Sequence, residues 1–331
     1  MTYLPSMINL FSLHLMIMLS LCLTSRAADP LAKVGRVVFL GDSITYAGTF
    51  IADTEAYLTL SNAEFSSEFL NLGLPSETVS GLSEPGHAGG AFPRPTLLER
   101  LDRVLAQTKP DLIVVCYGMN DGIYSPFAED RFEKYQAGIK AVRAKAATAG
   151  AKVLHLTPPV FDSLPIREQT LPAGLEEYRQ PFVGYDDVLA RYSSWLLDQR
   201  AQGWDVVDIH GPMRAQLDKA RVVDPLAVLA KDGVHCGPEG HWLIAHALLK
   251  HWNAFDTGAK SATTGAEGLA AWPQGKQIRA LVGQRQEILK HAWLSATQHQ
   301  RPGIAPGLPL KEAEAKARAI HDEIRAKLAE R

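Results

Sequence analysis

The chain has few cysteines and no excess of charge of either sign. It contains 3 cysteines, and 34 Lys and Arg residues against 36 Asp and Glu residues leave a formal net charge of -2. A near-neutral chain lacks the basic face that attracts nucleic acid regardless of sequence. Zinc-finger spacings, a Walker phosphate loop and a GxGxxG motif after a strand are also missing. The sequence therefore argues against nucleic acid as a partner and indicates no metal and no dinucleotide cofactor.

The first residues form a long apolar run. The segment from Met7 to Leu23 is strongly apolar, and small residues at Ser25 and Ala27 suit signal-peptidase cleavage near Ala27. An uncleaved membrane anchor is the alternative, for which the run is short and interrupted by polar residues. No Lys or Arg precedes the run, so the positive n-region is weak. We predict a signal peptide over 1–28, export to the periplasm or the extracellular space, and no stable membrane insertion after cleavage.

Short apolar segments alternate with helical patterns along most of the chain. Continuous apolar strands separated by helices are typical of a parallel sheet covered on both faces. With right-handed crossovers, this order predicts an α/β fold, a three-layer α/β/α sandwich whose sheet has about five parallel strands. The predicted strands are Arg36–Leu40, Glu68–Leu72, Asp111–Tyr117, Lys152–Leu156 and Asp205–Ile209.

The composition changes after about residue 256. The segment 256–267 is rich in Gly, Ala and Thr, which is typical of a linker, and two amphipathic helical patterns follow it. Two helices alone bury little core, so we expect them to pack on the main domain. The predicted organisation is an α/β domain over 29–256, followed by a linker and helical extension over 257–331.

Four short polar blocks stand out in this pattern. Three of them directly follow predicted strands, and the fourth precedes a helix that begins at Pro238. Since ligands in open α/β sheets bind at the carboxyl ends of the strands, the blocks are expected to meet there. They are Gly41-Asp42-Ser43-Ile44-Thr45, Asn71-Leu72-Gly73, Gly118-Met119-Asn120-Asp121-Gly122 and Asp232-Gly233-Val234-His235.

The residue types in these blocks suit nucleophilic catalysis. A serine nucleophile needs a base that takes its proton and a carboxylate that orients the base. The spacing of Asp232 and His235 lets the carboxylate reach one ring nitrogen and leaves the other free to face Ser43. Gly73 and Asn120 offer N–H donors for a developing oxyanion. Each block alone is also compatible with an ordinary polar turn.

The ordered set GDSIT, NLG, GMND and DGVH resembles the SGNH hydrolase (GDSL-like lipase/esterase) family over roughly residues 35–250. The nucleophile block reads GDSI and not GxSxG, which argues against the α/β-hydrolase fold. The resemblance implies a flavodoxin-like catalytic domain that hydrolyses carboxylic esters without a metal or another cofactor. It implies that Ser43, Asp232 and His235 are the catalytic residues and that Ser43, Gly73 and Asn120 form the oxyanion hole.

The substrate is less well defined by the sequence. Export and a shallow site favour small acyl groups, such as acetyl esters on carbohydrate, and a small-molecule or carbohydrate ester as the partner. A non-catalytic carbohydrate-binding or surface protein on the same fold is the alternative from another class. An acyltransferase or a lipase-type member would use the same residues.

Other residues receive weaker interpretations. His87 lies in a Gly-rich loop before Arg94, and Tyr124 follows the Asn120 block, so both are candidate substrate-binding residues. Cys116 and Cys236 remain after cleavage, and a bridge between them has no support in their spacing. Residues interpreted as structural are the pair Asp208 and His210, His155 as a hydrogen-bonded core histidine, Trp293 in the core, and His299 and Arg301 on the solvated surface.

Overall fold

The computed structural model describes residues 31–254 and 262–330. The predicted signal peptide over 1–28, with its cleavage site near Ala27, lies outside the described residues, as does part of the predicted linker. Among the helices of the described ranges, none combines the length and the apolar character that crossing a bilayer requires.

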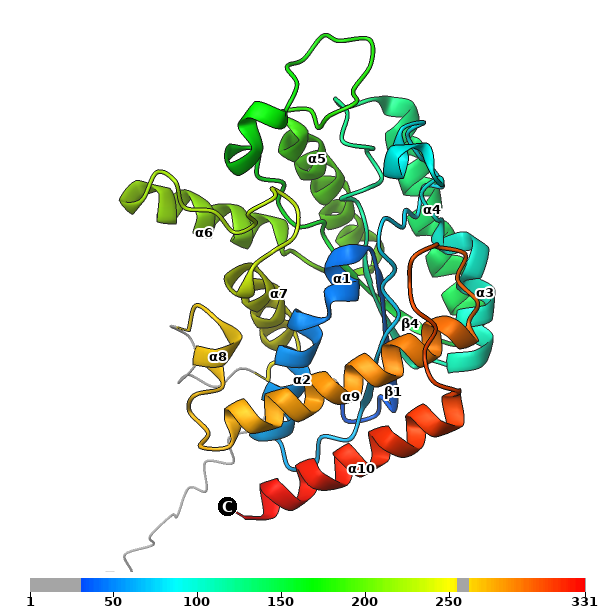
Figure 1. Ribbon diagram of the computed structural model, residues 1–331, viewed down its shortest axis with the longest axis vertical. Coiled ribbons are helices and arrows are strands. Elements are labelled where there is room, and N and C mark those ends of the chain that lie inside the picture. The colour runs from blue at the N-terminus through cyan, green and yellow to red at the C-terminus, as the bar shows by residue number, and fades with distance from the viewer. Residues whose placement is uncertain (1–30, 255–261, 331) are drawn as a thin grey trace, which may run out of the picture.

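The described residues form a five-stranded parallel sheet in the order β2-β1-β3-β4-β5. Figure 1 labels β1 and β4 of this sheet. Every residue of β3 is buried, as expected for a strand covered on both faces. The sandwich predicted from the sequence is therefore confirmed, with strand ends that differ by one or two residues. The strands are β1 (Arg36–Gly41), β2 (Glu68–Asn71), β3 (Leu112–Cys116), β4 (Lys152–Leu156) and β5 (Asp205–Val207).

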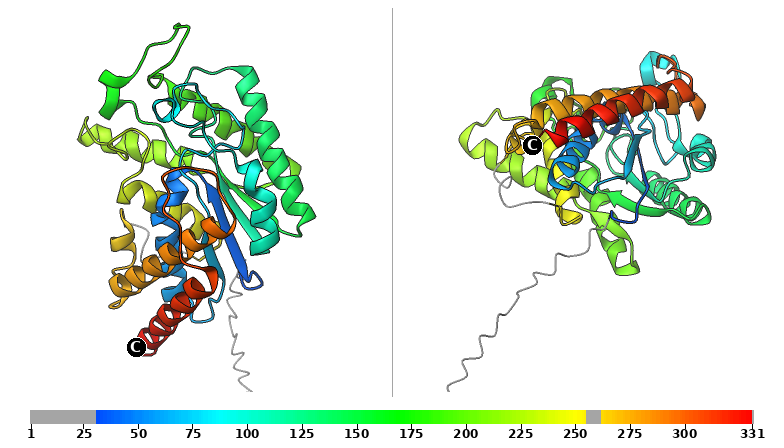
Figure 2. Two further views of the ribbon diagram at one scale, coloured as in Figure 1. Left: turned by 45° about the vertical axis from the view of Figure 1, so that its right-hand side comes forward. Right: turned by 90° about the horizontal axis from the view of Figure 1, so that it is seen from below.

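Helices cover both faces of the sheet. The connection from β1 to β2 runs toward one edge of the sheet, whereas the connections from β2 to β3, β4 and β5 run toward the other edge. Because each crossover is right-handed, the helices of the two sets lie on opposite faces. Accordingly α2 packs with α7 on one face, whereas α3, α4 and α5 lie on the other (Figure 2). These helices are α2 (Thr49–Ser61), α3 (Leu97–Thr108), α4 (Glu129–Thr148), α5 (Tyr185–Asp198) and α7 (Pro238–His251), and α6 (His210–Val223) lies between β5 and α7 in the chain.

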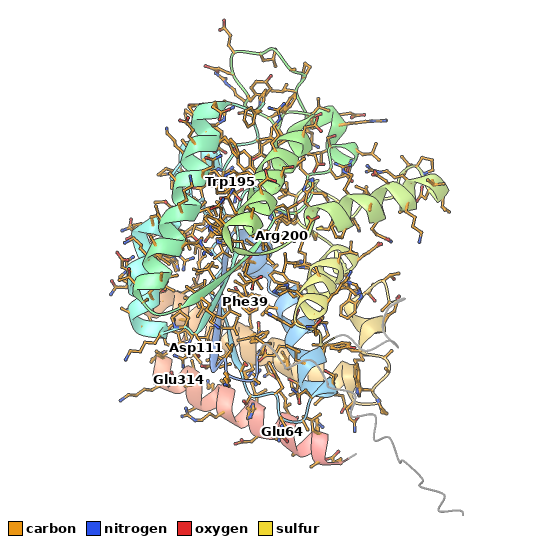
Figure 3. All side chains as sticks on the ribbon, turned by 180° about the vertical axis from the view of Figure 1, so that it is seen from behind. Phe39, Glu64, Asp111, Trp195, Arg200 and Glu314 are labelled. Atoms are coloured by element: carbon orange, nitrogen blue, oxygen red, sulfur yellow. The ribbon has the colours of Figure 1, made fainter. Side chains whose placement is uncertain are left out.

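Aromatic side chains fill the space between the layers. Phe39 of β1 lies near the centre of the molecule (Figure 3) and is fully buried between Phe50 of α2 and Phe69 of β2, with ring centroids 6.1 and 5.1 Å away. Burial of such rings contributes a large part of the stabilisation of the core. The core thus fixes β1, whose carboxyl end carries the first polar block.

The last helices pack on this sandwich. After α8 (Gly265–Gly268), helix α9 (Gly275–Ala296) crosses α2 and the edge strand β2, and α10 (Leu310–Ala329) packs along α9 (Figure 1). Ile278, Val282 and Leu289 of α9 are buried, as their helical spacing requires. The division into a domain over 29–256 and an extension over 257–331 stays a prediction.

Candidate active site

Ser43 lies at the carboxyl end of β1, where the strand passes into α1 (Ser43–Ala47). Asp42 caps this helix, because its side chain accepts a hydrogen bond of 2.9 Å from the Ile44 N–H. Gly41 permits the tight turn: a Cβ there would lie 2.1 Å from Thr45 Oγ1 and 2.7 Å from the Cys116 carbonyl. The turn therefore places Ser43 at the start of α1, at the carboxyl edge of the sheet. The loops that carry Gly73 and Asn120 leave the sheet at the same edge.

Ser43, His235 and Asp232 form a continuous hydrogen-bonded chain. His235 Nε2 lies 2.7 Å from Ser43 Oγ, although the two residues are 192 positions apart. His235 Nδ1 lies 2.7 Å from Asp232 Oδ2. Asp232 Oδ1 also accepts hydrogen bonds from the N–H groups of Val234 and His235, at 3.0 and 2.8 Å. Gly233 has φ +77°, which this compact loop requires.

The electrostatics of these groups follow from their surroundings. Partial burial acts to raise the pKa of Asp232, but hydrogen bonds from the His235 side chain and from the N–H groups of His235 and Val234 outweigh it and lower that pKa. Asp232 is therefore an anion at neutral pH. Burial raises the pKa of Asp42, next to Ser43, to about 7.

Asn120 lies in the loop after β3 with both ends of its amide engaged. Nδ2 donates to the Glu77 carbonyl at 3.2 Å. Oδ1 accepts from Arg94 Nη1 at 2.9 Å and from Tyr124 Oη at 3.1 Å. One N–H of Nδ2 remains without a partner among the described residues.

Gly73 lies in the loop after β2, close to the helix that Ser43 begins. A Cβ at this position would lie 2.4 Å from the Tyr46 N atom, so a larger residue would separate the two segments. The Gly73 N–H donates to Asn71 Oδ1 at 2.9 Å. Asn71 Nδ2 in turn donates to the Thr45 carbonyl at 2.8 Å. The N–H expected in the oxyanion hole is therefore already engaged within its own turn.

The two candidate substrate-binding residues, His87 and Tyr124, lie in the loops that follow β2 and β3, at the carboxyl edge of the sheet. Tyr124 has φ +54°, and its hydroxyl faces Asn120. His87 begins a short 3₁₀ helix, η1 (His87–Gly90), with its Nδ1 3.6 Å from Glu84 Oε1. Burial and the nearby Arg94 lower the pKa of His87. Their roles toward a substrate stay predictions.

Arg94 is the residue in this region that sequence reasoning undervalued. The sequence places it only after the Gly-rich loop of His87, yet its side chain is 7% exposed and is hydrogen-bonded to Asn120 and Glu84. A single arginine in a Gly- and Pro-rich segment has no periodicity, so no pattern indicates its partners 10 and 26 positions away.

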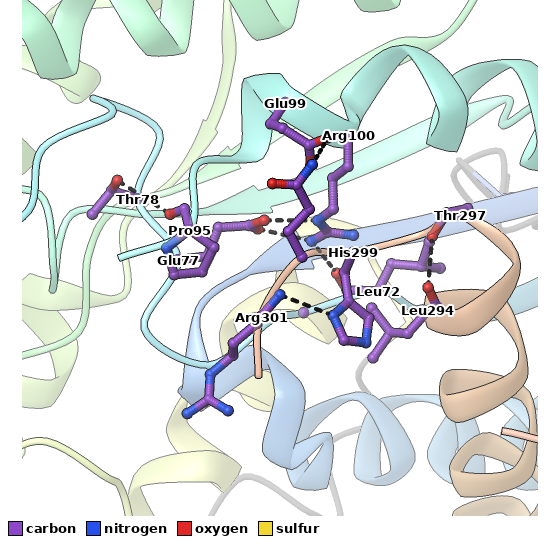
Figure 4. A network of polar contacts seen from close by, with 12 residues as sticks. Leu72, Glu77, Thr78, Pro95, Glu99, Arg100, Leu294, Thr297, His299 and Arg301 are labelled. Carbon is purple, nitrogen blue, oxygen red and sulfur yellow. Dashed lines mark hydrogen bonds and ion pairs between the residues drawn. The ribbon is translucent and has the colours of Figure 1, made fainter. Parts of the chain in front are cut away.

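The extension also reaches this side of the sheet. Lys290 Nζ donates to the Tyr46 carbonyl at 3.0 Å, and Arg301 Nε donates to the Pro75 carbonyl at 2.8 Å. In Figure 4 the His299–Arg301 segment lies beside the Glu77–Arg100 pair. The interpretation of Arg301 as solvated surface was therefore wrong, because its head group binds a loop of the sandwich.

Three further side chains were interpreted as structural, namely Trp293, His155 and His210. Trp293 is buried, as predicted. His155 is buried in β4 and stacked on Trp204, but neither ring nitrogen has a partner among the described residues, so its prediction as a hydrogen-bonded core histidine was wrong. His210 Nδ1 faces the Pro158 carbonyl at 3.2 Å. Asp208, the other member of this acid–histidine pair, accepts hydrogen bonds from Thr157 Oγ1 and the Gly211 N–H.

The described residues hold no group of three or more His, Cys, Asp or Glu side chains placed to bind a metal ion. Cys116 and Cys236 are both buried and are not joined in a disulfide. Burial raises the pKa of both thiols, to about 12 for Cys236, so neither is a ready nucleophile.

One family model and several solved structures are similar to this chain. The GDSL-like Lipase/Acylhydrolase family model matches residues 39–243, more than half of the chain. A search of curated proteins found no match. Among solved structures, a gut microbial diltiazem-metabolizing enzyme is 20% identical with a TM-score of 0.47, and the match covers 66% of this chain and 47% of that one.

Two further solved structures are similar to the chain. Axe2, an acetylxylan esterase from Geobacillus stearothermophilus, is 20% identical with a TM-score of 0.48, and the match covers 67% of this chain and 95% of that one. The acetyl xylan esterase AlAXEase is 19% identical with a TM-score of 0.46, and the match covers 65% of this chain and 98% of that one.

Proposed function

Because the chain belongs to the GDSL-like lipase/acylhydrolase family and is a carboxylic ester hydrolase, we propose that Ser43, His235 and Asp232 are its catalytic triad. The observation that carries the proposal is the pair of contacts made by His235, 2.7 Å from Ser43 Oγ on one side and 2.7 Å from Asp232 Oδ2 on the other. These distances are those that proton transfer and orientation of the base require.

In the first half of the reaction, His235 Nε2 takes the Ser43 proton as Oγ attacks the ester carbonyl. The Asp232 carboxylate stabilises the imidazolium through Nδ1. The tetrahedral intermediate then collapses, His235 gives the proton to the alcohol oxygen, and the C–O bond to the alcohol breaks. This step leaves an acyl group on Ser43.

In the second half, His235 takes a proton from water, and the resulting hydroxide attacks the acyl carbonyl. Collapse of this intermediate releases the carboxylic acid and returns the proton to Ser43 Oγ. Deacylation thus uses the same atoms as acylation, with water in place of the alcohol.

The oxyanion of each intermediate needs donors that are already in place. We assign this role to the N–H of Ser43, which opens a helix and so has no intrahelical acceptor, and to the open N–H of Asn120 Nδ2. Gly73 joins them by sharing its N–H between Asn71 Oδ1 and the oxyanion.

We further propose that the substrate carries a small acyl group, such as acetyl, on a carbohydrate outside the cytoplasm. The support is the openness of the site, since the His235 and Asp232 side chains are 53% and 56% exposed, which leaves room for a bulky alcohol. Asp232 and His235 also line a pocket of about 410 Å³, and we place the alcohol part of the ester there.

The experiment is acetate release from 4-nitrophenyl acetate and from an acetylated sugar by wild type and Ser43→Ala. We expect Ser43→Ala to lower kcat by on the order of 10⁴-fold. Undiminished activity of the purified variant would overturn the assignment. Acetyl transfer to an added sugar acceptor instead of water would identify an acyltransferase. No turnover, together with a Ser43 that a fluorophosphonate does not label, would support the binding-protein alternative.

A further inference from the structure

We propose that Arg94, held by Glu84, is a positioning residue that orients the Asn120 amide for the oxyanion. This inference rests on the proposed function, because it concerns the donor that Asn120 would offer. Arg94 Nη1 donates to Asn120 Oδ1 at 2.9 Å. The remaining polar edge of the guanidinium is occupied by Glu84, with Nε to Oε2 and Nη2 to Oε1 both at 2.6 Å.

The orientation of an asparagine amide is set by its partners, since a half-turn exchanges the oxygen and the nitrogen. Asn120 Oδ1 faces two donors, Arg94 Nη1 and Tyr124 Oη. A flipped amide would direct its NH₂ group at a cation that cannot accept a hydrogen bond. It would also turn its oxygen toward the Glu77 carbonyl, which accepts the Nδ2 hydrogen bond of 3.2 Å. The arrangement therefore permits one orientation, in which Nδ2 keeps an open N–H.

The charge on Arg94 adds to this effect. A hydrogen bond from a cation to Oδ1 draws electron density from the amide and makes its N–H a stronger donor. The guanidinium also lies over the Tyr124 ring, 5.5 Å from its centroid. Its side chain is 7% exposed, so water screens the charge little.

The loop that carries Arg94 is closed at its base. The Arg94 N–H donates to Ser83 Oγ at 2.9 Å, across 11 positions. Burial acts to raise the pKa of Glu84, but its hydrogen bonds and charge interaction with Arg94 outweigh this and lower the pKa. Glu84 therefore stays charged and keeps the guanidinium in place. The loop residues 84–94 thus act on the site through Arg94.

A double-mutant cycle between Arg94 and Asn120 tests the inference. The variants are Arg94→Met, which keeps the length of the side chain, Asn120→Ala, and both together, assayed for kcat and KM on 4-nitrophenyl acetate. We expect Asn120→Ala to lower kcat by roughly 10²–10³-fold. Arg94→Met is expected to lower kcat by on the order of 10-fold or more with little change in KM, and to have almost no further effect once Asn120 is Ala.

Three controls separate positioning from loss of fold. Glu84→Gln combined with Arg94→Met avoids a stranded buried carboxylate and is expected to give the same fall in kcat. Tyr124→Phe removes the other donor to Asn120 Oδ1. It is expected to lower kcat less than Arg94→Met does, and again only while Asn120 is present. Arg318→Met removes an exposed arginine of α10 and is expected to leave kcat unchanged.

Each contrary outcome has a distinct meaning. Equal losses from Arg94→Met in the presence and absence of Asn120 would overturn the positioning role. A raised KM at unchanged kcat would overturn it as well and would make Arg94 a substrate contact. If Asn120→Ala alone had no effect, the oxyanion role in the proposed function would fail instead. If Arg94→Met does not fold, the variant that combines it with Glu84→Gln, assayed with and without Asn120→Ala, decides by the same criterion.

Discussion

Arg100 and Glu77 form a fully buried, two-pronged ion pair, with Nε to Oε1 and Nη2 to Oε2 both at 2.7 Å. Arg100 Nη2 also donates to the Leu72 carbonyl at 2.7 Å, and Tyr117 Oη donates to Glu77 Oε2 at 2.5 Å. The pair therefore joins the loop after β2 to α3, and Tyr117 joins the same loop to the end of β3. The Glu77 carbonyl is also the acceptor for Asn120 Nδ2, so the same segment supports the site.

We expect Arg100→Met to lower the free energy of unfolding by about 3–5 kcal/mol, because it leaves the Glu77 carboxylate buried without its partner. Urea denaturation followed by circular dichroism measures the loss. The double variant Glu77→Gln with Arg100→Met removes both charges and should recover part of it. A single variant as stable as wild type would show that the pair does not hold these loops together.

Asp232→Asn is expected to lower kcat by about 10⁴-fold with the fold intact, because an amide favours the wrong tautomer of His235 and does not stabilise its cation. The matched control is Asp208→Asn. Asp208 accepts hydrogen bonds from the Gly211 N–H and Thr157 Oγ1 and lies in the other acid–histidine pair. We expect the control to keep the wild-type kcat on 4-nitrophenyl acetate. A larger loss for the control would reverse the two assignments.

Lys290→Met is expected to lower both stability and kcat. The ammonium group is nearly buried, contacts the Tyr46 carbonyl at 3.0 Å and Glu287 Oε2 at 2.6 Å, and lies over the Tyr46 ring. Its removal takes from the part-buried Tyr46 carbonyl the charged one of its two donors, Asn71 Nδ2 at 3.3 Å being the other, at a cost of about 1–3 kcal/mol in the free energy of unfolding. Lys316→Met removes an exposed lysine of α10 and serves as the control. Identical urea midpoints and kcat values for the two variants would contradict the expectation.

Stability is expected to fall as pH drops from about 6.5 toward 3, in part because of His155. Burial, and secondarily the charge of Arg143, lower the pKa of His155 to about 3. The unfolded chain takes up a proton on this ring near pH 6.5, whereas the folded chain does not, so the contribution present above that pH is lost below it. His155→Phe keeps a ring against Trp204 and should flatten the dependence of the urea midpoint on pH between 4 and 7. An unchanged slope would exclude His155 as the cause.

The sequence predicted the elements whose signal is local. Continuous apolar runs marked all the strands, and the polar blocks were found because each directly follows a strand or precedes a helix. The predicted strand Asp205–Ile209 was too long, since β5 ends at Val207 and the Ile209 N–H donates to Thr157 Oγ1 instead of a neighbouring strand. An apolar pattern indicates the position of a strand. It does not indicate where the strand ends, because that depends on the acceptor that each backbone N–H finds.

Among contacts between residues far apart in the chain, the sequence predicted those within the four polar blocks and not those made outside them. Four blocks in order predicted that Ser43, Asp232 and His235 lie together, and the structure brings them into hydrogen-bond reach. Their catalytic roles stay a prediction. The partners of Arg94 and Lys290 were not predicted. Lys290 binds a backbone carbonyl, which every residue type carries, and Arg94 binds an amide oxygen, which needs no opposite charge, so neither contact leaves a pattern in the sequence.

Two donors from α9 and the segment after it are synthesised long after the residues that they contact. Lys290 and Arg301 reach back 244 and 226 positions, to the carbonyls of Tyr46 and Pro75. A chain emerging from the ribosome therefore has its sheet and all four polar blocks before it has these two donors, and until then water takes their place. A chain that ends before α9 would therefore carry all the reacting groups but lack the two donors to the Tyr46 and Pro75 carbonyls.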